Sequence, residues 1–354
     1  MEKYDVIIVG AGPAGATTAM TIDPNQSGKS VLLIEGRKTV GVPMQCGEAL
    51  PTYEELKTIF PGVDCPELFD LPEDVVAGRI EGIKFVAPSG RSYVAELKGH
   101  MFYREKLDQY LFKQAINSGA EYKLATRVVR IDGNRVETTA GTFSGAIIVG
   151  ADGALSIVSE SVPGFAPNRD LCRCSFVIAE GDFYEELVEL WFGSRFPGGY
   201  FWLFPKNGEA NIGVGVRGPK NVRKILDDML TEISSVKPFK VKQRGGGIVP
   251  LGGLKDRIVS GNAALVGDAA GMVFPSNGGG TGVAMVGGHI LGQTIREELP
   301  LAEYEARVNA LLRKVLHNSL RTRRSMDRVR GSNTLFSIVM WLVNVRGWRS
   351  FIIG

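Results

Sequence analysis

The sequence predicts an α/β fold, α+β overall, in which a parallel nucleotide-binding sheet carries an inserted antiparallel sheet and a helical C-terminal tail. Three observations predict it. A short apolar strand near the N-terminus runs directly into a glycine-rich turn and a helix of small residues. Apolar strands of the same kind return near residues 146 and 263. Between these two lies a strand-rich stretch with alternating aromatic residues.

The N-terminal strand, Val6–Val9, is short, apolar and β-branched, as expected of a parallel strand buried on both faces. Gly10, Gly12 and Gly15 follow it with the spacing G-x-G-x-x-G. Gly10 allows a tight turn, Gly12 lets the backbone approach a pyrophosphate, and Gly15 lets the helix lie close to the sheet. The helix from Ala14 is built of small residues, so its N-terminal amides and dipole can face an anion.

A second strand, Val31–Ile34, ends in Glu35, where a carboxylate can bond a ribose hydroxyl. The alternative is a glycine turn without a ligand, and 45 glycines in the chain make chance matches easy. Here, however, strand, glycines, helix, second strand and acidic residue follow one another in the required order. The stretch therefore predicts a dinucleotide site on a Rossmann-like domain.

The bulk composition, with 44% hydrophobic and 22% charged residues, is that of an ordinary globular protein, and 354 residues suggest two domains. Four cysteines in so long a chain do not form a disulfide framework, and neither they nor the three histidines show metal-ligand spacing. We expect no metal, no nucleic acid partner, no signal peptide and no membrane span, and thus a cytoplasmic protein.

The remaining elements are predicted in chain order, and the nucleotide domain is discontinuous. Helices are expected at 50–60, 104–118, 222–233 and 281–295, and strands at 80–86, 92–97, 121–124, 128–131, 135–139, 146–149, 174–179, 187–192, 200–204, 211–216 and 263–266. The expected nucleotide-binding domain comprises 1–75, 101–160 and 255–300, the strand-rich substrate domain 76–100 and 161–254, and the basic helical region 301–354.

Asp268 stands at the end of the apolar strand 263–266, ahead of small residues. A carboxylate there can accept a hydrogen bond from a ribitol hydroxyl, while the amides that follow face phosphate or the edge of a flavin. Taken alone, Asp268 reads equally well as a helix N-cap. Together with the N-terminal fingerprint, it favours FAD over NAD.

Several motifs together resemble the flavin-dependent enzymes typified by p-hydroxybenzoate hydroxylase: the fingerprint with Glu35, Arg104 at a helix start, Gly150–Gly153 and Gly267-Asp268. Within that group, the loop G-V-P-M-Q-C-G-E at 41–48 resembles that of the geranylgeranyl reductases. The segment 197–205 also matches their P-x-x-Y-x-W-x-F-P motif. The resemblance implies an FAD-dependent reductase that saturates C=C bonds of geranylgeranyl groups, in archaeal-type ether lipid biosynthesis.

The resemblance also implies a set of site residues. Cys46 would be the catalytic residue, and Tyr200, Trp202 and Phe204 would bind the substrate. Glycine is usual in the family where this chain has Ala49, and the chain is shorter than usual after Gly280. The residues implied to bind FAD are Gly10, Gly12, Ala14, Gly15, Glu35, Cys46, Gly47, Ala49, Arg104, Val128, Asp268, Gly280 and Thr281.

Some of these residues also have a purely structural interpretation. Alternation places Tyr200, Trp202 and Phe204 on one face of a strand, where they can wall a groove for a polyprenyl tail or form an ordinary aromatic core. Cys46 can deliver a proton or simply pack against the flavin ring. Arg104 is either a surface residue or the partner of a specific anion, since the helix dipole disfavours a cation at a helix start.

The C-terminal part is strongly basic, with ten Lys and Arg from Arg307 onward against the single acid Asp327. Arg321 to Arg330 can form a solvated face. They precede the apolar run Leu335–Val345, which is followed by Arg346, Trp348 and Arg349, a pattern typical of an interfacial anchor on anionic lipid. We expect peripheral attachment to the inner face of the cell membrane, with a buried terminal helix as the alternative.

Two further functions remain open from the sequence. One is an FAD-dependent aromatic monooxygenase, and the other is a non-enzymatic prenyl-binding escort on the same fold. The expected substrate is a prenylated lipid or a prenyl diphosphate, and the expected electron donor is NAD(P)H or ferredoxin. Gly245–Gly247 is not followed by a helix, so no second nucleotide site is predicted.

Overall fold

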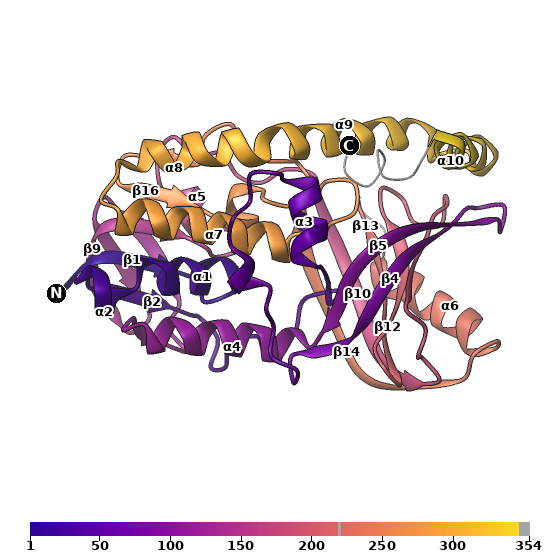
Figure 1. The fold of residues 1–354 in the computed structure, drawn as a ribbon, viewed down its shortest axis with the longest axis horizontal. Coiled ribbons are helices and arrows are strands. Elements are labelled where there is room, and N and C mark those ends of the chain that lie inside the picture. Colours follow the sequence, from indigo (N-terminus) through magenta and orange to yellow (C-terminus); the bar gives the residue numbers. More distant parts are fainter. Residues whose placement is uncertain (219–220, 347–354) are drawn as a thin grey trace.

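The computed structural model describes residues 1–218 and 221–346, which contain two sheets of eight strands each (Figure 1). The first sheet has a parallel core in the order β16-β9-β1-β2-β6, with β15 antiparallel at its edge and the β7–β8 hairpin attached through β9. Its strands are β1 (Glu2–Val9), β2 (Val31–Ile34), β6 (Glu121–Lys123), β7 (Val128–Asp132), β8 (Arg135–Thr138), β9 (Gly141–Gly150), β15 (Val259–Ser260) and β16 (Ala263–Leu265).

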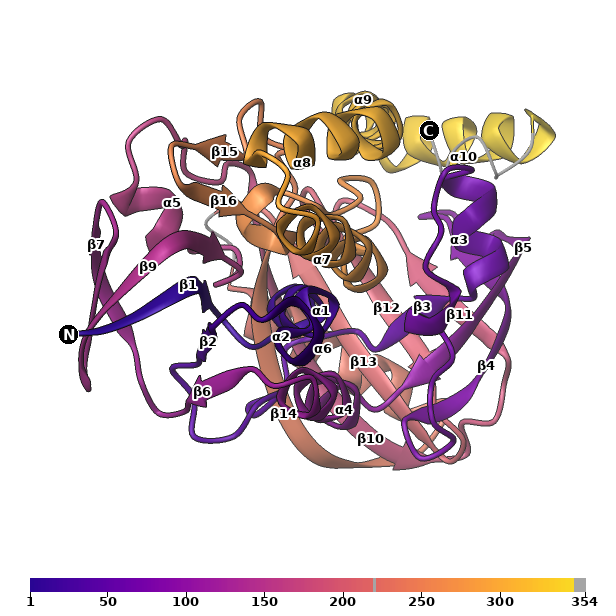
Figure 2. The same ribbon diagram turned by 60° about the vertical axis from the view of Figure 1, so that its left-hand side comes forward.

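One layer of helices covers this sheet: α1 (Pro13–Ile22) packs between α7 (Thr281–Arg296) and α4 (Arg104–Asn117), as Figure 2 shows nearly along their axes. Two glycines of α7 allow the close approach to α1. A Cβ at Gly288 would lie 2.5 Å from the Ala14 carbonyl oxygen, and one at Gly292 would lie 2.9 Å from that of Thr18. The small residues of both helices therefore serve packing as well as anion binding.

The second sheet has the order β14-β10-β13-β12-β11-β4-β5-β3, and all its pairs are antiparallel except β11 with β4. Phe201 and Leu203 pack on one face beneath α6 (Val222–Ser234), while Trp202 belongs to the core of the opposite face. The strands of this second sheet are β3 (Ala49–Pro51), β4 (Val76–Val86), β5 (Ser92–Phe102), β10 (Leu171–Gly181), β11 (Leu187–Trp191), β12 (Tyr200–Pro205), β13 (Glu209–Val216) and β14 (Phe239–Pro250).

The C-terminal helices run from the first sheet to the second along one side of the molecule (Figure 1). Tyr304 anchors this segment, since its hydroxyl donates to the Leu265 carbonyl over 2.8 Å. The segment comprises α8 (Leu301–Val308), a π-helical stretch (Asn309–Arg313), α9 (Lys314–Val329) and α10 (Asn333–Arg346). The remaining helices are short: α2 (Pro24–Ser27), α3 (Tyr53–Ile59), α5 (Ile157–Ser161), η1 (Pro66–Leu68) and η2 (Gly267–Ala270).

One prediction of local structure was wrong in part, and one long strand was missed. The helix expected at 50–60 begins only at Tyr53, because Thr52 caps it by accepting from the Glu55 amide, and the preceding residues form β3. The long strand β14 was not predicted, since its polar, exposed positions and three glycines hide any apolar alternation.

The apolar run near the C-terminus forms the helix α10, which carries apolar side chains on more than one side. Phe336 and Met340 are buried in the core of the second sheet, whereas a second side of the helix remains exposed. Within the described residues, no helix is long and apolar enough to cross a membrane. Trp348 and Arg349, which the sequence analysis included in the anchor, lie outside the described residues. The exposed apolar residues of α10 are Leu335, Ile338, Trp341 and Leu342.

Candidate cofactor and substrate site

A cavity of about 910 Å³ is lined by residues of both sheets. All of the predicted site residues line this cavity except Gly15, which packs against the Gly10 carbonyl oxygen. Those that line it are Gly10, Gly12, Ala14, Glu35, Cys46, Gly47, Ala49, Arg104, Val128, Tyr200, Trp202, Phe204, Asp268, Gly280 and Thr281. Motifs separated by more than 200 residues in sequence thus meet in one cavity.

The glycine turn has the geometry of a pyrophosphate cradle. A Cβ at Gly15 would lie 1.9 Å from the Gly10 carbonyl oxygen, so α1 begins directly against the turn. A Cβ at Gly12 would meet no atom of the described residues within 4 Å, so the backbone there is open to a ligand. Glu35 accepts from the amides of Ala11 (3.1 Å) and Arg37 (2.9 Å), which fixes the second strand to the turn. These residues fit the ADP half of FAD.

Asp268 lies in η2, between β16 and α7, with its side chain at the cavity wall. Burial raises the pKa of Asp268 to about 6, and only the charge of Arg104 opposes this. The N-terminus of α7, at Thr281, lines the same cavity. A carboxylate and a helix N-terminus in this arrangement suit a ribitol hydroxyl and a phosphate or ring carbonyl.

The shifted pKa of Asp268 predicts a pH-dependent stability of the ligand-free chain. The folded pKa, about 6, lies above the ordinary 3.8, so folding favours the neutral acid. Its contribution is complete below pH 3.8 and is lost as the pH rises through 6. The free energy of unfolding should therefore fall between pH 4 and pH 7.5 by about 2–3 kcal/mol more in the wild type than in Asp268→Asn, as measured by denaturant unfolding. Equal losses would contradict the assignment.

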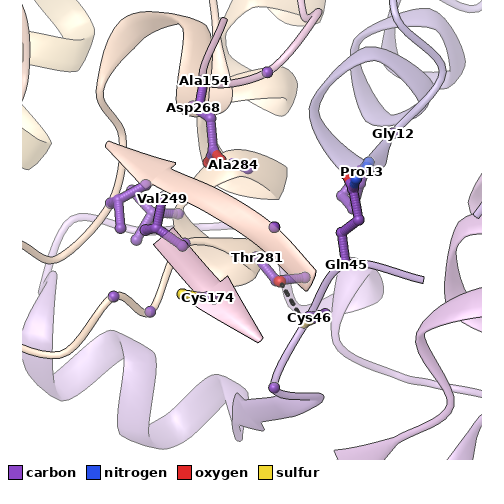
Figure 3. A pocket seen from close by; sticks show the side chains of 18 of the residues that line it. Gly12, Pro13, Gln45, Cys46, Ala154, Cys174, Val249, Asp268, Thr281 and Ala284 are labelled. Carbon is purple, nitrogen blue, oxygen red and sulfur yellow. Dashed lines mark hydrogen bonds between the residues drawn. The ribbon is translucent and has the colours of Figure 1, made fainter. Parts of the chain in front are cut away.

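Cys46 faces the start of α7, and its Sγ lies 4.0 Å from the Thr281 hydroxyl (Figure 3). The sulfur also accepts from the Glu48 amide over 3.1 Å. Nearby, Arg104 pairs with Asp108 over 2.6 Å. Burial lowers the pKa of Arg104, but its interactions with Asp108 and Cys46 outweigh burial and raise the pKa above its ordinary value. Arg104 is therefore a half-buried, ion-paired cation that lines the cavity rather than a free surface residue.

Beneath the Cys46 loop lies a buried ion pair that the sequence analysis missed. Glu48 and Lys206 are each 2% exposed, and the Lys206 Nζ lies 2.8 Å from the Glu48 Oε2. The same oxygen accepts from Asn211 Nδ2 (3.0 Å), and Oε1 accepts from the Arg104 amide (3.0 Å). Glu48 also has φ 68°, in the left-handed region. These contacts hold the loop in one conformation.

The same network connects the loop to the aromatic strand. Asn211 donates to the Cys46 carbonyl over 2.9 Å and accepts from the Trp202 indole over 2.8 Å. A Cβ at Gly47 would lie 3.2 Å from the Phe204 ring, so the loop passes directly against the strand. The sequence signals for this network are that Glu48 ends the 41–48 loop motif and that Lys206 follows the P-x-x-Y-x-W-x-F-P segment.

The aromatic side chains form one continuous wall of the cavity. Ring centroids are 6.1 Å apart between Tyr200 and Trp202 and 6.3 Å apart between Trp202 and Phe204. The Tyr200 hydroxyl donates to the Asn277 carbonyl, and burial raises the pKa of Tyr200 above its ordinary value. Beyond this wall the cavity continues among apolar side chains, namely Ile80, Ile83, Leu97, Phe176, Val188 and Leu190.

Solved structures identify the class of fold. A crystal structure described as geranylgeranyl bacteriochlorophyll reductase-like, from Thermoplasma acidophilum, has a TM-score of 0.81 at 23% identity and covers 96% of this chain and 91% of its own. A flavin-dependent brominase has a TM-score of 0.64 at 17% identity, with 99% and 94% covered. The chain therefore has the fold of the flavin-dependent oxidoreductases.

Sequence comparison identifies the family. Residues 170–249 match the family model of the geranylgeranyl reductase catalytic domain. Digeranylgeranylglycerophospholipid reductase 1 of Methanopyrus kandleri is 32% identical over 84% of this chain and 81% of its own length. Reductase 2 of Methanothermobacter thermautotrophicus is 31% identical over 92% and 88%. The chain belongs to the digeranylgeranylglycerophospholipid reductase family, which confirms the resemblance seen in the motifs.

Proposed function

We propose that the protein is an FAD-dependent reductase that saturates C=C bonds of geranylgeranyl groups in archaeal-type ether lipid biosynthesis. One observation carries the proposal: a single cavity joins the pyrophosphate cradle to an aromatic wall and an apolar extension. A polyprenyl chain has only apolar surface to offer, and the residues beyond Trp202 provide a matching lining. The relatives named for this reaction support the substrate class.

FAD held in this cavity would, once reduced, supply hydride-transfer chemistry for the alkene. The protein's own residues bind, orient and exclude water. Gly12 and Glu35 would hold the ADP half, Asp268 the ribitol, and the start of α7 the ring edge. Since an unactivated alkene offers little charge to stabilise, fixing the chain against Tyr200 and Trp202 in a dry cavity supplies much of the effect.

Mixing the anaerobically reduced protein with a geranylgeranyl phospholipid tests this proposal. The expected result is oxidation of the flavin by the lipid in the absence of oxygen, followed in its visible spectrum. A fully saturated phytanyl lipid is the matched control and should leave the spectrum unchanged. If the flavin stays reduced with both lipids, the proposal is wrong.

Cys46 is the residue we propose to deliver the proton to the second alkene carbon. Replacing Cys46 with alanine should slow flavin oxidation by the lipid by about 10²-fold while FAD remains bound. Anaerobic stopped-flow spectroscopy measures the rate, and Cys65→Ala, which removes a buried thiol that does not line the cavity, is the control. An unchanged rate in Cys46→Ala would mean that the thiol only packs against the ring.

We also propose peripheral contact with an anionic membrane on its cytoplasmic face. The exposed apolar residues of α10, Leu335, Ile338, Trp341 and Leu342, follow an exposed basic row on the preceding helix α9. Basic residues beside a short apolar helix suit the boundary of an anionic bilayer, at about 1 kcal/mol per cation. The row consists of Lys314, Arg321, Arg324 and Arg328, which recur at helical spacing.

Vesicle sedimentation tests the membrane contact. Replacing both Ile338 and Trp341 with glutamate should reduce binding to anionic vesicles by on the order of tenfold or more. Val236→Glu is the matched control. Val236 is 86% exposed and follows α6, which packs on the face of the second sheet opposite to α10. Equal binding by the three proteins, or binding that does not depend on anionic lipid, would contradict the proposal.

A further inference from the structure

Three arginines and two aspartates meet where α9 passes the second sheet. Arg323 Nη2 lies 2.8 Å from an Asp170 carboxylate oxygen, and Arg217 Nη2 lies 2.5 Å from one of Asp327. Arg330 has a more distant partner, with its Nε 3.9 Å from Asp327. Three guanidinium groups therefore share two carboxylates, and the cluster carries one positive charge in excess.

The excess charge is buried and incompletely hydrogen-bonded. Arg323 is 2% exposed and Arg330 is 7% exposed. Among the described residues, Nε and Nη1 of Arg323 and Nε of Arg330 have no hydrogen-bond partner, and neither has Oδ1 of Asp327. The Asp327 carboxylate lies 3.7 Å from Arg323 Nη1 and 3.9 Å from Arg330 Nε, too far to satisfy either donor. Burial lowers the pKa of Arg330 to about 10, although Asp327 opposes this shift. Buried donors of this kind favour an additional acceptor.

Both arginines line the cavity, beside the aromatic wall. Arg330 Nη1 donates to the Gly199 carbonyl over 2.5 Å, next to Tyr200. Its guanidinium carbon lies 5.7 Å from the Phe192 centroid and 5.8 Å from that of Phe336, which fixes the side chain from two sides. An acceptor for the free donors can therefore come from a ligand in the cavity.

The positive charge also acts on the neighbouring thiol of Cys172, which lines the same part of the cavity. The pKa of Cys172 is lowered, first by a hydrogen bond from Cys174 and then by the charges of Arg217, Arg330 and Arg323. Burial alone would raise it. The arginine cluster thus adds to the stabilisation of negative charge at a thiol that lines the same cavity.

We propose that Arg323 and Arg330 form a subsite for a phosphate group, and that this group is the head of the prenylated substrate. The assignment of the phosphate to the substrate rests on the proposed function. Guanidinium forks match phosphate oxygens, and one phosphate balances the excess charge of the cluster. A lipid held here would extend its chain past Tyr200 and Trp202 toward the apolar end of the cavity.

Binding to the FAD-loaded full-length protein tests the subsite without any turnover. Titration calorimetry with glycerol phosphate, and separately with inorganic diphosphate, should show binding, and Arg323→Gln should weaken it by about tenfold or more. Arg195→Gln is the matched control, because the Arg195 side chain is 53% exposed and does not line the cavity. Tighter binding of glycerol phosphate indicates a phospholipid substrate, and tighter binding of diphosphate a prenyl diphosphate.

A turnover assay separates this inference from the proposed function. Arg323→Gln should raise KM for the phosphate-bearing substrate and leave reduction of uncharged geranylgeraniol unchanged. Arg330→Lys, which keeps the charge and loses the fork, should weaken binding in the same direction, and it replaces Arg323→Gln if that variant does not fold. Phosphate binding that is absent from the wild type, or unaffected by these substitutions, overturns the subsite. Arg323-dependent phosphate binding without prenyl reduction overturns the proposed function alone.

Discussion

Replacing Lys206 with methionine is expected to lower the free energy of unfolding by about 3–5 kcal/mol. The substitution keeps the apolar stem but leaves the Glu48 carboxylate, 2% exposed, without its cation. The remaining donors to this carboxylate, from Asn211 and the Arg104 amide, do not neutralise its charge. Because Glu48 fixes the Cys46 loop, the affinity for FAD should fall as well. Denaturant unfolding and FAD titration measure the two effects.

Two variants control for this prediction. Lys224→Met removes a lysine from an ion pair whose side chains are 71% and 56% exposed, so its unfolding free energy should change little. Combining Lys206→Met with Glu48→Gln removes both charges and should recover part of the loss. A loss of stability for Lys206→Met no greater than for Lys224→Met would show that the buried pair does not hold the loop.

Gly12→Ala is expected to raise the dissociation constant of FAD by tenfold or more, while the unfolding of the ligand-free protein stays unchanged. The backbone at Gly12 has φ −72°, which alanine adopts freely, and the added methyl would meet no atom of the described chain within 4 Å. The methyl would instead occupy the space where the pyrophosphate approaches, and tenfold corresponds to about 1.4 kcal/mol. Fluorescence titration of the flavin measures the affinity.

Gly15→Ala provides the contrasting case, since its methyl would lie 1.9 Å from the Gly10 carbonyl oxygen. It should lower both the stability of the ligand-free protein and its affinity for FAD. If Gly12→Ala binds FAD as tightly as the wild type, the pyrophosphate does not lie on the glycine turn.

The sequence predicts the parts of this structure that depend on local pattern. The fingerprint from Val6 to Glu35 defines the strand, the turn and the helix because Gly10 and Gly15 leave no room for a side chain. Alternation in β12 places Tyr200 and Trp202 on one face, and the structure places both rings in the cavity wall. The roles of these residues toward FAD and substrate remain predictions.

Contacts between distant segments could not be predicted. Glu48 and Lys206 each stand at the end of a separate motif, 158 residues apart in sequence, and only the folded chain brings them together. The basic residues of α9 also could not be assigned to buried or exposed positions from sequence. Arg323 contacts Asp170 and Arg330 donates to the Gly199 carbonyl, whereas the neighbouring arginines are exposed. Helical spacing alone does not reveal which side of α9 meets the second sheet.

The most direct test of the account is the mass of the product. The FAD-loaded protein, reduced without oxygen and incubated with a digeranylgeranylglycerophospholipid, should return a lipid heavier by two hydrogen atoms for each bond saturated. Trp202→Ala, which opens the wall of the cavity, should bind FAD but return less of this product. Recovery of the lipid at unchanged mass under fully reduced flavin would contradict the central claim.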